Sequence, residues 1–301
     1  MGYRLRVGAV SLVVAALLLW QGEFHPASGG PAGAQAAKSA APACDRAAFR
    51  VIVDVGHTAE APGAKSARGV YEYEFNLRLA TLIEQSLLDA GFAKAVLLVT
   101  EGKARPGLAH RVSEANSASA DLFLSIHHDS VPDKFLEKWD YEGEQRGFSD
   151  RFKGHSIFVS KDNADLQASL AFASLLGKEL KARDLHYTSH YTEKFMGNRR
   201  RTLVDARAGV YRYDQLIVLK NTRMPAVLLE AGSIINRDEE LLMASPERQA
   251  LISAAVTDAV DGFCATRRPQ SSEQVARRPA PAKQALQPAA TKPSANAAKP
   301  R

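Results

Sequence analysis

Two histidines and a glutamate stand at the ends of apolar stretches, and side chains of these types can bind a metal ion. His57 follows the run VIVDVG, His127 ends the run DLFLSIH, and Glu230 ends the run PAVLLE. Runs that are apolar at nearly every position are typical of parallel strands buried on both faces. The carboxyl ends of such strands lie along one edge of the sheet, where α/β proteins bind ligands. We therefore expect these three side chains to meet at one site.

A fourth group, Glu72, opens a helical pattern, and the helix dipole favours a carboxylate in the first turn. The loop between His57 and Glu72 contains Gly, Ala and Pro and can turn tightly enough to bring Glu72 to the same edge. Two imidazoles and one carboxylate suffice to bind a catalytic zinc ion, and a further carboxylate can act as general base. The four residues thus supply the parts of a zinc hydrolase.

The residues alone leave two choices open. Glu74 is an equal rival to Glu72, and either one is also explained as an ordinary acidic residue at a helix start. His128 is a rival to His127, because neighbouring strand residues point to opposite faces and only one of the two can enter the site. In a strand that is buried on both faces, the hydrophobic pattern does not choose between them.

The elements that would position these residues alternate along the middle of the chain. Strands that alternate with helices predict an α/β fold, here a single domain with a mostly parallel sheet of about six strands flanked by helices. Two long polar connections, 130–154 and 184–209, are expected to border the site. The predicted strands cover 48–55, 94–100, 121–127, 155–160, 216–221 and 226–231, and the predicted helices cover 72–90, 107–118, 165–183 and 238–263.

The two ends of the chain differ in composition from the middle. Residues 1–36 join a basic start to an apolar run and small residues, a pattern typical of a secretory signal peptide; an uncleaved anchor is the alternative. A short linker, 37–47, would precede the domain at 48–266. Residues 267–301 are rich in Pro, Ala, Lys and Arg and are predicted to be a disordered basic tail. We expect an exported protein, periplasmic or wall-associated, that meets a membrane only through its signal segment before cleavage.

The predicted tail carries most of the net charge. It holds eight Lys or Arg and one Glu, whereas the whole chain has a net charge of +6, so the remaining 266 residues carry a net charge of −1. A nearly neutral domain gives no support to a nucleic-acid groove, and we expect no nucleic-acid partner. The cluster from Arg199 to Arg201 is expected to be a solvated face, with contact to wall carboxylates as the alternative.

Only two cysteines occur, Cys44 and Cys264, before the first predicted strand and near the end of the last predicted helix. In an exported protein they could form a disulfide, and two free buried thiols are the equally weighted alternative. Their wide separation argues against a cysteine zinc site, which needs closely spaced pairs.

Four motifs, in order, give the chain a resemblance to a known family. The segments VIVDVGH, EYEFNLRLA, ADLFLSIHHD and LKNTRMPAVLLEAGSIIN resemble those of the zinc-dependent N-acetylmuramoyl-L-alanine amidases, which are exported cell-wall enzymes. The resemblance covers about residues 50–263. Thr58 and Ala59 depart from the family pattern, in which glycines follow the first histidine, and His128 and Asp129 replace a small residue and an asparagine. No ligand is lost by these departures.

The resemblance settles both open choices. It implies that the metal ligands are His57, Glu72 and His127, that they hold one zinc ion per chain, and that Glu230 is the catalytic carboxylate. The residues that we expect to bind substrate are Arg111, Asp129 and Asn236.

The resemblance also implies a reaction, the hydrolysis of the amide bond between N-acetylmuramic acid and L-alanine in peptidoglycan, during wall remodelling or cell separation. A related zinc peptidase or deacetylase is one alternative, and a non-catalytic wall-binding domain is another. A binding module has no need of all four chemical residues, so the sequence disfavours it. Peptidoglycan is the expected partner, and an activator protein is a further candidate.

Overall fold

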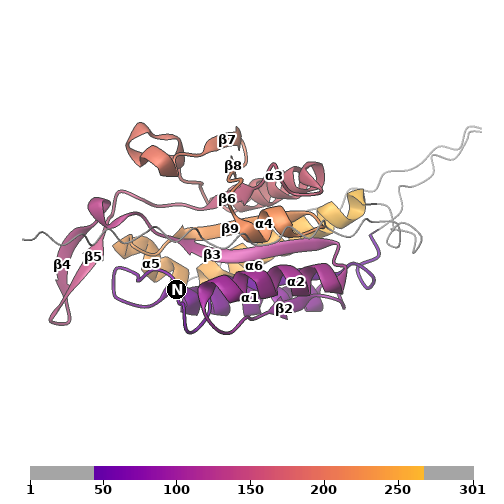
Figure 1. Ribbon diagram of the computed structural model, residues 1–301, viewed down its shortest axis with the longest axis horizontal. Helices are drawn as coiled ribbons and strands as arrows, with labels where there is room; N and C mark the ends of the chain where they lie inside the picture. The colour runs from indigo at the N-terminus through magenta and orange to yellow at the C-terminus, as the bar shows by residue number, and fades with distance from the viewer. Residues whose placement is uncertain (1–43, 268–301) are drawn as a thin grey trace, which may run out of the picture. The chain divides into compact units, whose positions relative to one another are not determined.

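A seven-stranded sheet forms the middle layer of residues 44–267, the part of the chain that the computed structural model describes (Figure 1). The strand order is β2-β1-β3-β9-β6-β8-β7, and neighbouring strands are parallel except for the pairs β9–β6 and β8–β7. The prediction of an α/β fold with a mostly parallel sheet is confirmed, with seven strands. These are β1 Val51–Val55, β2 Val96–Leu98, β3 Leu122–Asp129, β6 Ser156–Val159, β7 Thr202–Asp205, β8 Val210–Arg212 and β9 Ala226–Ser233.

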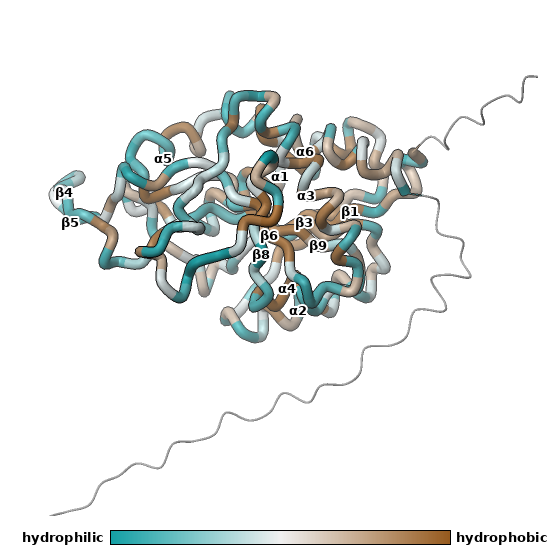
Figure 2. Tube along the Cα trace, turned by 90° about the horizontal axis from the view of Figure 1, so that it is seen from above, coloured by the Kyte–Doolittle hydropathy of each residue, from teal (hydrophilic) through white to brown (hydrophobic). Residues whose placement is uncertain are grey.

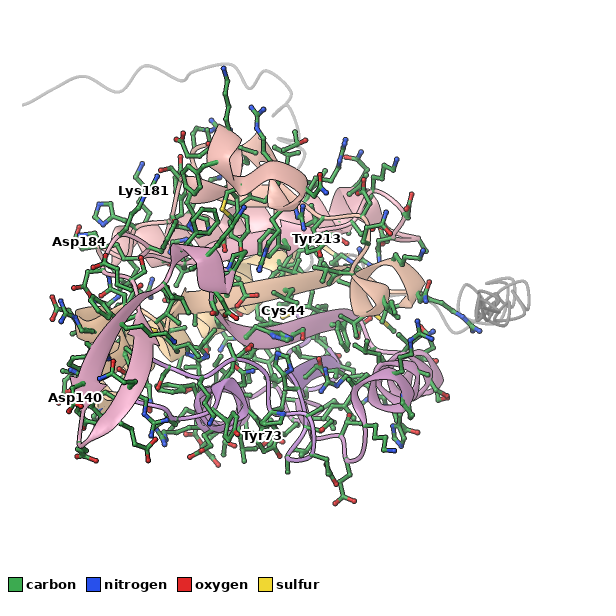
Figure 3. All side chains as sticks on the ribbon, turned by 60° about the vertical axis from the view of Figure 1, so that its left-hand side comes forward. Cys44, Tyr73, Asp140, Lys181, Asp184 and Tyr213 are labelled. Atoms are coloured by element: carbon green, nitrogen blue, oxygen red, sulfur yellow. A yellow bond between two sulfur atoms is a disulfide. The ribbon has the colours of Figure 1, made fainter. Side chains whose placement is uncertain are left out.

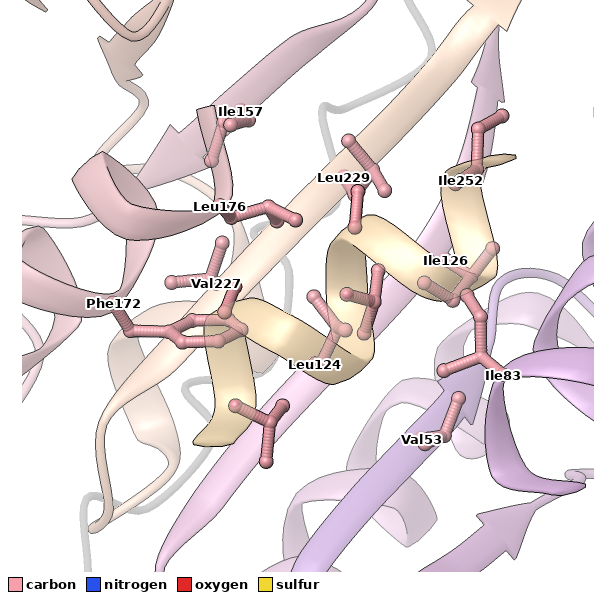
Figure 4. Close-up of a cluster of buried hydrophobic side chains, with 14 of the residues drawn as sticks. Val53, Ile83, Leu124, Ile126, Ile157, Phe172, Leu176, Val227, Leu229 and Ile252 are labelled. Carbon is pink, nitrogen blue, oxygen red and sulfur yellow. The ribbon is translucent and has the colours of Figure 1, made fainter. Parts of the chain in front are cut away.

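Helices cover both faces of the sheet because its strands alternate two sets of apolar side chains. One set, which includes Val53, Leu124 and Leu229, packs under α1, α3 and α6 (Figure 4). The other set, which includes Phe123 and Leu228, packs against α2 and α4 on the opposite face (Figure 2). The helices are α1 Glu72–Asp89, α2 Ala104–Ala118, α3 Leu166–Ala182, α4 Ile217–Asn221, α5 Arg237–Ala244 and α6 Pro246–Thr266.

Two sequence-based assignments were wrong. The apolar run at 216–221 forms the short helix α4 instead of a strand, and its Val218 and Leu219 pack into the α2-side core. A short apolar run fits a buried helix as well as a buried strand. The predicted helix at 238–263 is two helices, because Ser245 caps the second with a hydrogen bond from the Arg248 amide to its Oγ and Pro246 occupies the first turn.

The long connection 130–154 contains secondary structure that the sequence did not predict. It holds the hairpin β4 Glu137–Tyr141 and β5 Glu144–Phe148, which stands away from the sheet and carries Asp140 (Figure 3). The indole N–H of Trp139 donates a hydrogen bond of 3.0 Å to the Ala67 carbonyl. The hairpin is thereby fastened to the loop that joins β1 to α1. Three short 3-10 helices, Asp133–Phe135, His190–Thr192 and Lys194–Arg199, complete the two long connections.

Cys44 and Cys264 form a disulfide, with their Cα atoms 5.2 Å apart, so the choice that the sequence left open is resolved. The bond ties the segment before β1 to the end of α6. The predicted signal peptide lies outside the described residues, as do most of the linker and all of the tail except Arg267. Among residues 44–267, no helix is both long and apolar enough to cross a membrane.

Candidate active site

The site lies at the sheet edge where the parallel strands β1, β3 and β9 end. β1 delivers His57 through Gly56, and there is no room for a larger residue at position 56, because an added Cβ would lie 2.4 Å from the His127 ring. His57 itself has a φ of +68°, a left-handed conformation that is uncommon outside glycine. The chain therefore bends sharply at the end of β1 and turns the His57 ring towards His127, with the ring centroids 5.0 Å apart.

Glu72 bridges the two histidines. Its Oε2 lies 2.9 Å from His57 Nε2, and its Oε1 lies 2.9 Å from His127 Nδ1. The turn that brings Glu72 here passes through Gly63, whose φ is +79° and whose added Cβ would meet Glu72 Oε2 at 2.5 Å. The three side chains offer donor atoms that all lie within 4.8 Å of one another. They form the one such group of His, Cys, Asp or Glu within residues 44–267.

The two alternative candidates, Glu74 and His128, are not part of this group of side chains. Glu74 is exposed on the outer side of α1. His128 is 2% exposed and points towards α1, where its Nδ1 lies 2.8 Å from the Asn76 side-chain oxygen. His127 instead shares a strand face with Ser125 and stands opposite Glu230 in the β3–β9 pairing. Both rings contact side chains of α1: His127 meets Glu72 at the start of the helix, and His128 meets Asn76 one turn further on.

The donor set fits a zinc ion. Ligand atoms bound at about 2.0–2.1 Å in tetrahedral geometry lie roughly 3.3 Å apart, close to the observed contacts of 2.9 Å. Burial lowers the pKa of His127, which favours the neutral ring that ligates metals. Burial alone would raise the pKa of Glu72, but hydrogen bonds from His127 and His57 outweigh it and hold that pKa well below its usual range. Glu72 therefore carries the charge that a cation needs.

Glu230 lies in β9, directly opposite His127 on one side and Ser156 on the other. Its Oε2 is buried and has no hydrogen-bond partner within residues 44–267. Burial, followed by repulsion from Asp129 and Glu72, raises the pKa of Glu230 well above its ordinary value. A carboxylate with a raised pKa next to a metal site has the properties of a general base.

Asp129 is buried and contacts Tyr191 and His190 of the connection 184–209. The Tyr191 hydroxyl lies 2.8 Å from both of its carboxylate oxygens, and His190 Nε2 lies 3.7 Å from Oδ2. Burial raises the pKa of Asp129 to about 7, and the nearby Arg199 opposes that shift. Sequence reasoning did not single out Tyr191 or His190. The signal was the presence of these two polar rings in the connection 184–209, which was expected to border the site.

The other two residues expected to bind substrate make internal contacts. Arg111 is 3% exposed and lies beneath His57, between the His57 carbonyl and Asp54. Asn236 is 4% exposed, caps α5 by accepting from the Asp238 and Glu239 amides, and donates to the Asp150 carbonyl. The substrate-binding roles of Arg111, Asp129 and Asn236 stay predictions.

A cavity of about 770 Å³ lies beside the site, between the ends of the two long connections and α5. Its wall includes Phe152, His190 and Ala231, the residue after Glu230. None of His57, Glu72, His127 and Glu230 lines it. The connection 184–209 reaches the end of β3 through His190 and Tyr191, which contact Asp129, whereas a role of the connection 130–154 at the site stays a prediction.

Comparison with known proteins agrees with this arrangement. A family profile described as N-acetylmuramoyl-L-alanine amidase matches residues 51–262. The endolysin of Bacillus phage SPP1 is 28% identical over 194 residues, which are 64% of this chain and 58% of the endolysin. The chain therefore spans less than two thirds of the length of that curated relative.

Two solved structures share the fold. The N-acetylmuramyl-L-alanine amidase Ami1 from Mycobacterium smegmatis has a TM-score of 0.55 at 18% identity, over 73% of this chain and 98% of that chain. The CwlD amidase from Clostridioides difficile, solved in complex with the GerS lipoprotein, has a TM-score of 0.51 at 20% identity, over 71% and 98% of the two chains. Because the family profile matches residues 51–262, more than half of the chain, the chain belongs to the N-acetylmuramoyl-L-alanine amidase family.

Proposed function

We propose that this protein is a zinc-dependent amidase that hydrolyses the bond between N-acetylmuramic acid and L-alanine in peptidoglycan. One observation carries the proposal: His57, Glu72 and His127 converge within 4.8 Å, and an unpartnered Glu230 stands opposite His127 in a chain of this family. The family match supports the substrate, and the donor set supports the metal.

The three converging side chains would hold the zinc ion. Zinc at such a site supplies Lewis-acid chemistry, which polarises a carbonyl group and lowers the pKa of water. Glu72 offers the negative charge and the two histidines offer ring nitrogens, and the short turn through Gly63 fixes their separation. The side chain of His57 is 30% exposed and that of His127 is 15% exposed, so a substrate can approach from the His57 side.

Glu230 would move the proton. Its carboxylate accepts a proton from the water molecule whose oxygen attacks the amide carbonyl, and it later gives that proton to the leaving nitrogen as the C–N bond breaks. The products are the lactyl carboxylate of the sugar and a free amino group on L-alanine. The raised pKa of Glu230 suits this role, because a stronger base accepts a proton more readily.

We also propose that the protein acts outside the cytoplasm, in wall remodelling or cell separation. The Cys44–Cys264 disulfide supports this, because disulfides persist mainly in oxidising compartments. An activator protein is a further proposal, supported by the CwlD neighbour whose structure includes the GerS lipoprotein.

Product analysis tests the reaction. Purified wild-type protein and Glu230→Gln are incubated with peptidoglycan, and the soluble products are identified by mass spectrometry. The amidase proposal predicts stem peptides with a free L-alanine amino terminus and intact glycan strands, from the wild type alone. Released acetate would identify a deacetylase, and cut cross-links with no free L-alanine terminus would identify a peptidase. Absence of all three products, with and without candidate activators, would favour a wall-binding role.

A further inference from the structure

Arg111 occupies an unusual place for a long cationic side chain. It lies in α2, yet its side chain is 4% exposed and reaches under the end of β1. A guanidinium nitrogen donates a hydrogen bond to the main-chain carbonyl of His57, and Nε lies 3.4 Å from Asp54 Oδ1. Arginines are rarely buried in this way unless they are paired. Arg111 thus contacts two residues near the end of β1: Asp54, which lies within the strand, and His57, which lies just beyond it.

Asp54 is fixed independently of Arg111. It is fully buried, and the Ser125 hydroxyl of β3 donates a hydrogen bond of 2.6 Å to its Oδ2. Asp54 is therefore a rigid anchor inside the sheet, and Arg111 uses its planar, forked guanidinium to span the distance from this anchor to the His57 carbonyl.

His57 needs such an anchor because its backbone is in the left-handed region, at a φ of +68°. A non-glycine residue held there costs free energy that the surrounding contacts must offset. On the other side of the bend, Thr58 is fastened by its hydroxyl, which donates to the Gly102 carbonyl at 2.7 Å. The carbonyl of His57 and the side chain of Thr58 together fix the peptide that aims the His57 ring at Glu72.

We propose that Arg111 is a positioning residue, which holds His57 in the conformation that binds the metal. This inference rests on the proposed zinc function. In this role Arg111 contacts the backbone of the metal ligand His57 instead of the substrate, which the sequence had predicted it to bind. Residues that orient metal ligands typically change metal affinity by about 10–100-fold when they are removed.

The test compares Arg111→Met, Arg111→Lys and the matched control Arg105→Met, which alters an exposed arginine on the same helix. For each full-length protein, the zinc dissociation constant is measured by competition with a chromophoric chelator. The melting temperature is measured without metal, and kcat and KM on peptidoglycan fragments are measured at saturating zinc. Cobalt(II) is also bound in place of zinc, since its visible absorption reports the geometry of its ligands.

The positioning role predicts a zinc dissociation constant raised by about 10–100-fold in Arg111→Met, with an altered cobalt spectrum and a control that matches wild type. An unchanged zinc affinity in a folded Arg111→Met protein would overturn the inference and leave only a structural ion pair. A raised KM with unchanged zinc affinity would overturn it in favour of substrate binding.

If Arg111→Met does not fold, Arg111→Lys decides. Lysine keeps the charge beside Asp54 but cannot reach both acceptors with a forked group. We then expect zinc affinity to fall at least about threefold, whereas an affinity equal to wild type would contradict the proposal. Failure of the underlying function looks different, because in that case the wild-type protein itself would bind no zinc.

Discussion

Two glutamates stand in one site and are treated in opposite ways by their surroundings. Glu72 accepts contacts from two histidines, and these hold its pKa well below the usual range against the effect of burial. Glu230 has a buried oxygen with no partner, and burial together with Asp129 raises its pKa. Where the surroundings shift the pKa values of two carboxylates in opposite directions, the two groups can take different chemical roles. The difference assigns metal binding to Glu72 and proton transfer to Glu230.

The neighbours explain the contrast. The Glu72 side of the site is built from two imidazole rings at the ends of β1 and β3, so a carboxylate there gains hydrogen bonds. The Glu230 side brings a second acid, Asp129, whose oxygens are occupied by the Tyr191 hydroxyl. Arg199, which is exposed, opposes the raised pKa of Glu230.

The largest expected effect follows from removing the paired carboxylate. Glu72→Ala takes away the charged ligand, so we expect zinc binding and peptidoglycan hydrolysis both to be lost. Glu74→Ala, which alters an exposed glutamate in the same helical turn, serves as the control and should retain both. Metal analysis and product release on the two variants check this. Loss of zinc in Glu74→Ala with retention in Glu72→Ala would reverse the assignment.

Removing the unpaired carboxylate should slow the chemistry while the metal stays bound. For Glu230→Gln we expect kcat to fall by about 10²–10⁴-fold, the usual contribution of a general acid or base. KM and zinc affinity should stay near the wild-type values. Steady-state kinetics with metal analysis provide the measurement, and a kcat within a few-fold of wild type would exclude Glu230 as the base.

The Tyr191 hydroxyl donates a hydrogen bond to Asp129, on the Glu230 side of the site. Tyr191→Phe removes a hydroxyl that donates to a buried carboxylate, so we expect the free energy of unfolding to fall by about 1–3 kcal/mol. Tyr213→Phe is the control, because the Tyr213 hydroxyl makes no hydrogen bond within residues 44–267. Urea unfolding monitored by circular dichroism measures both. Equal stability of the two variants would show that the Tyr191 contact contributes little.

The two glutamates should also give the stability a pH dependence of opposite sign. The folded state holds the proton of Glu230 more tightly than the unfolded state, so this residue costs stability as pH rises above the unfolded pKa. Metal-free Glu230→Gln should therefore gain stability over wild type above about pH 4.5, by at most about 1.4 kcal/mol per pH unit. Glu72 behaves in the reverse way: its contribution is present above the unfolded pKa and is lost as pH falls towards the lower folded pKa.

Urea unfolding of the metal-free proteins between pH 4 and pH 8 checks this sign. Asp129, with its pKa of about 7, is present in both Glu230→Gln and wild type and so affects both curves. A difference between the two curves that shrinks as pH rises would contradict the assignment of a raised pKa to Glu230.

The sequence predicted the strands that end at the site because their apolar runs and polar ends are local features. β1, β3 and β9 were placed within a few residues, and β6 was placed too. The prediction of a strand at 216–221 was wrong because four consecutive apolar residues carry no period that separates helix from strand. β7 and β8 were missed because they are short and only partly apolar. β8 gains its place in the sheet from β6, which is distant in sequence, and β7 pairs with β8 alone.

The side-chain roles were harder to predict than the strands. The choice of His127 over His128 depends on which side chains each ring meets, and that is a property of the whole fold. Arg111 was expected to bind substrate, and its contacts with Asp54 and the His57 carbonyl depend on how α2 packs against the end of β1. Pairing of Cys44 with Cys264 likewise required the two ends of the domain to meet.

The most direct test of the account is a side-by-side zinc titration of Glu72→Gln and Glu230→Gln by calorimetry, with wild type alongside. Both substitutions replace a carboxyl group with an amide and keep the size of the side chain. The account predicts that Glu230→Gln binds one zinc ion per chain with wild-type affinity, whereas Glu72→Gln binds at least about 100-fold more weakly. Equal affinities in the two variants, whether both strong or both weak, would contradict the division of roles between the two carboxylates.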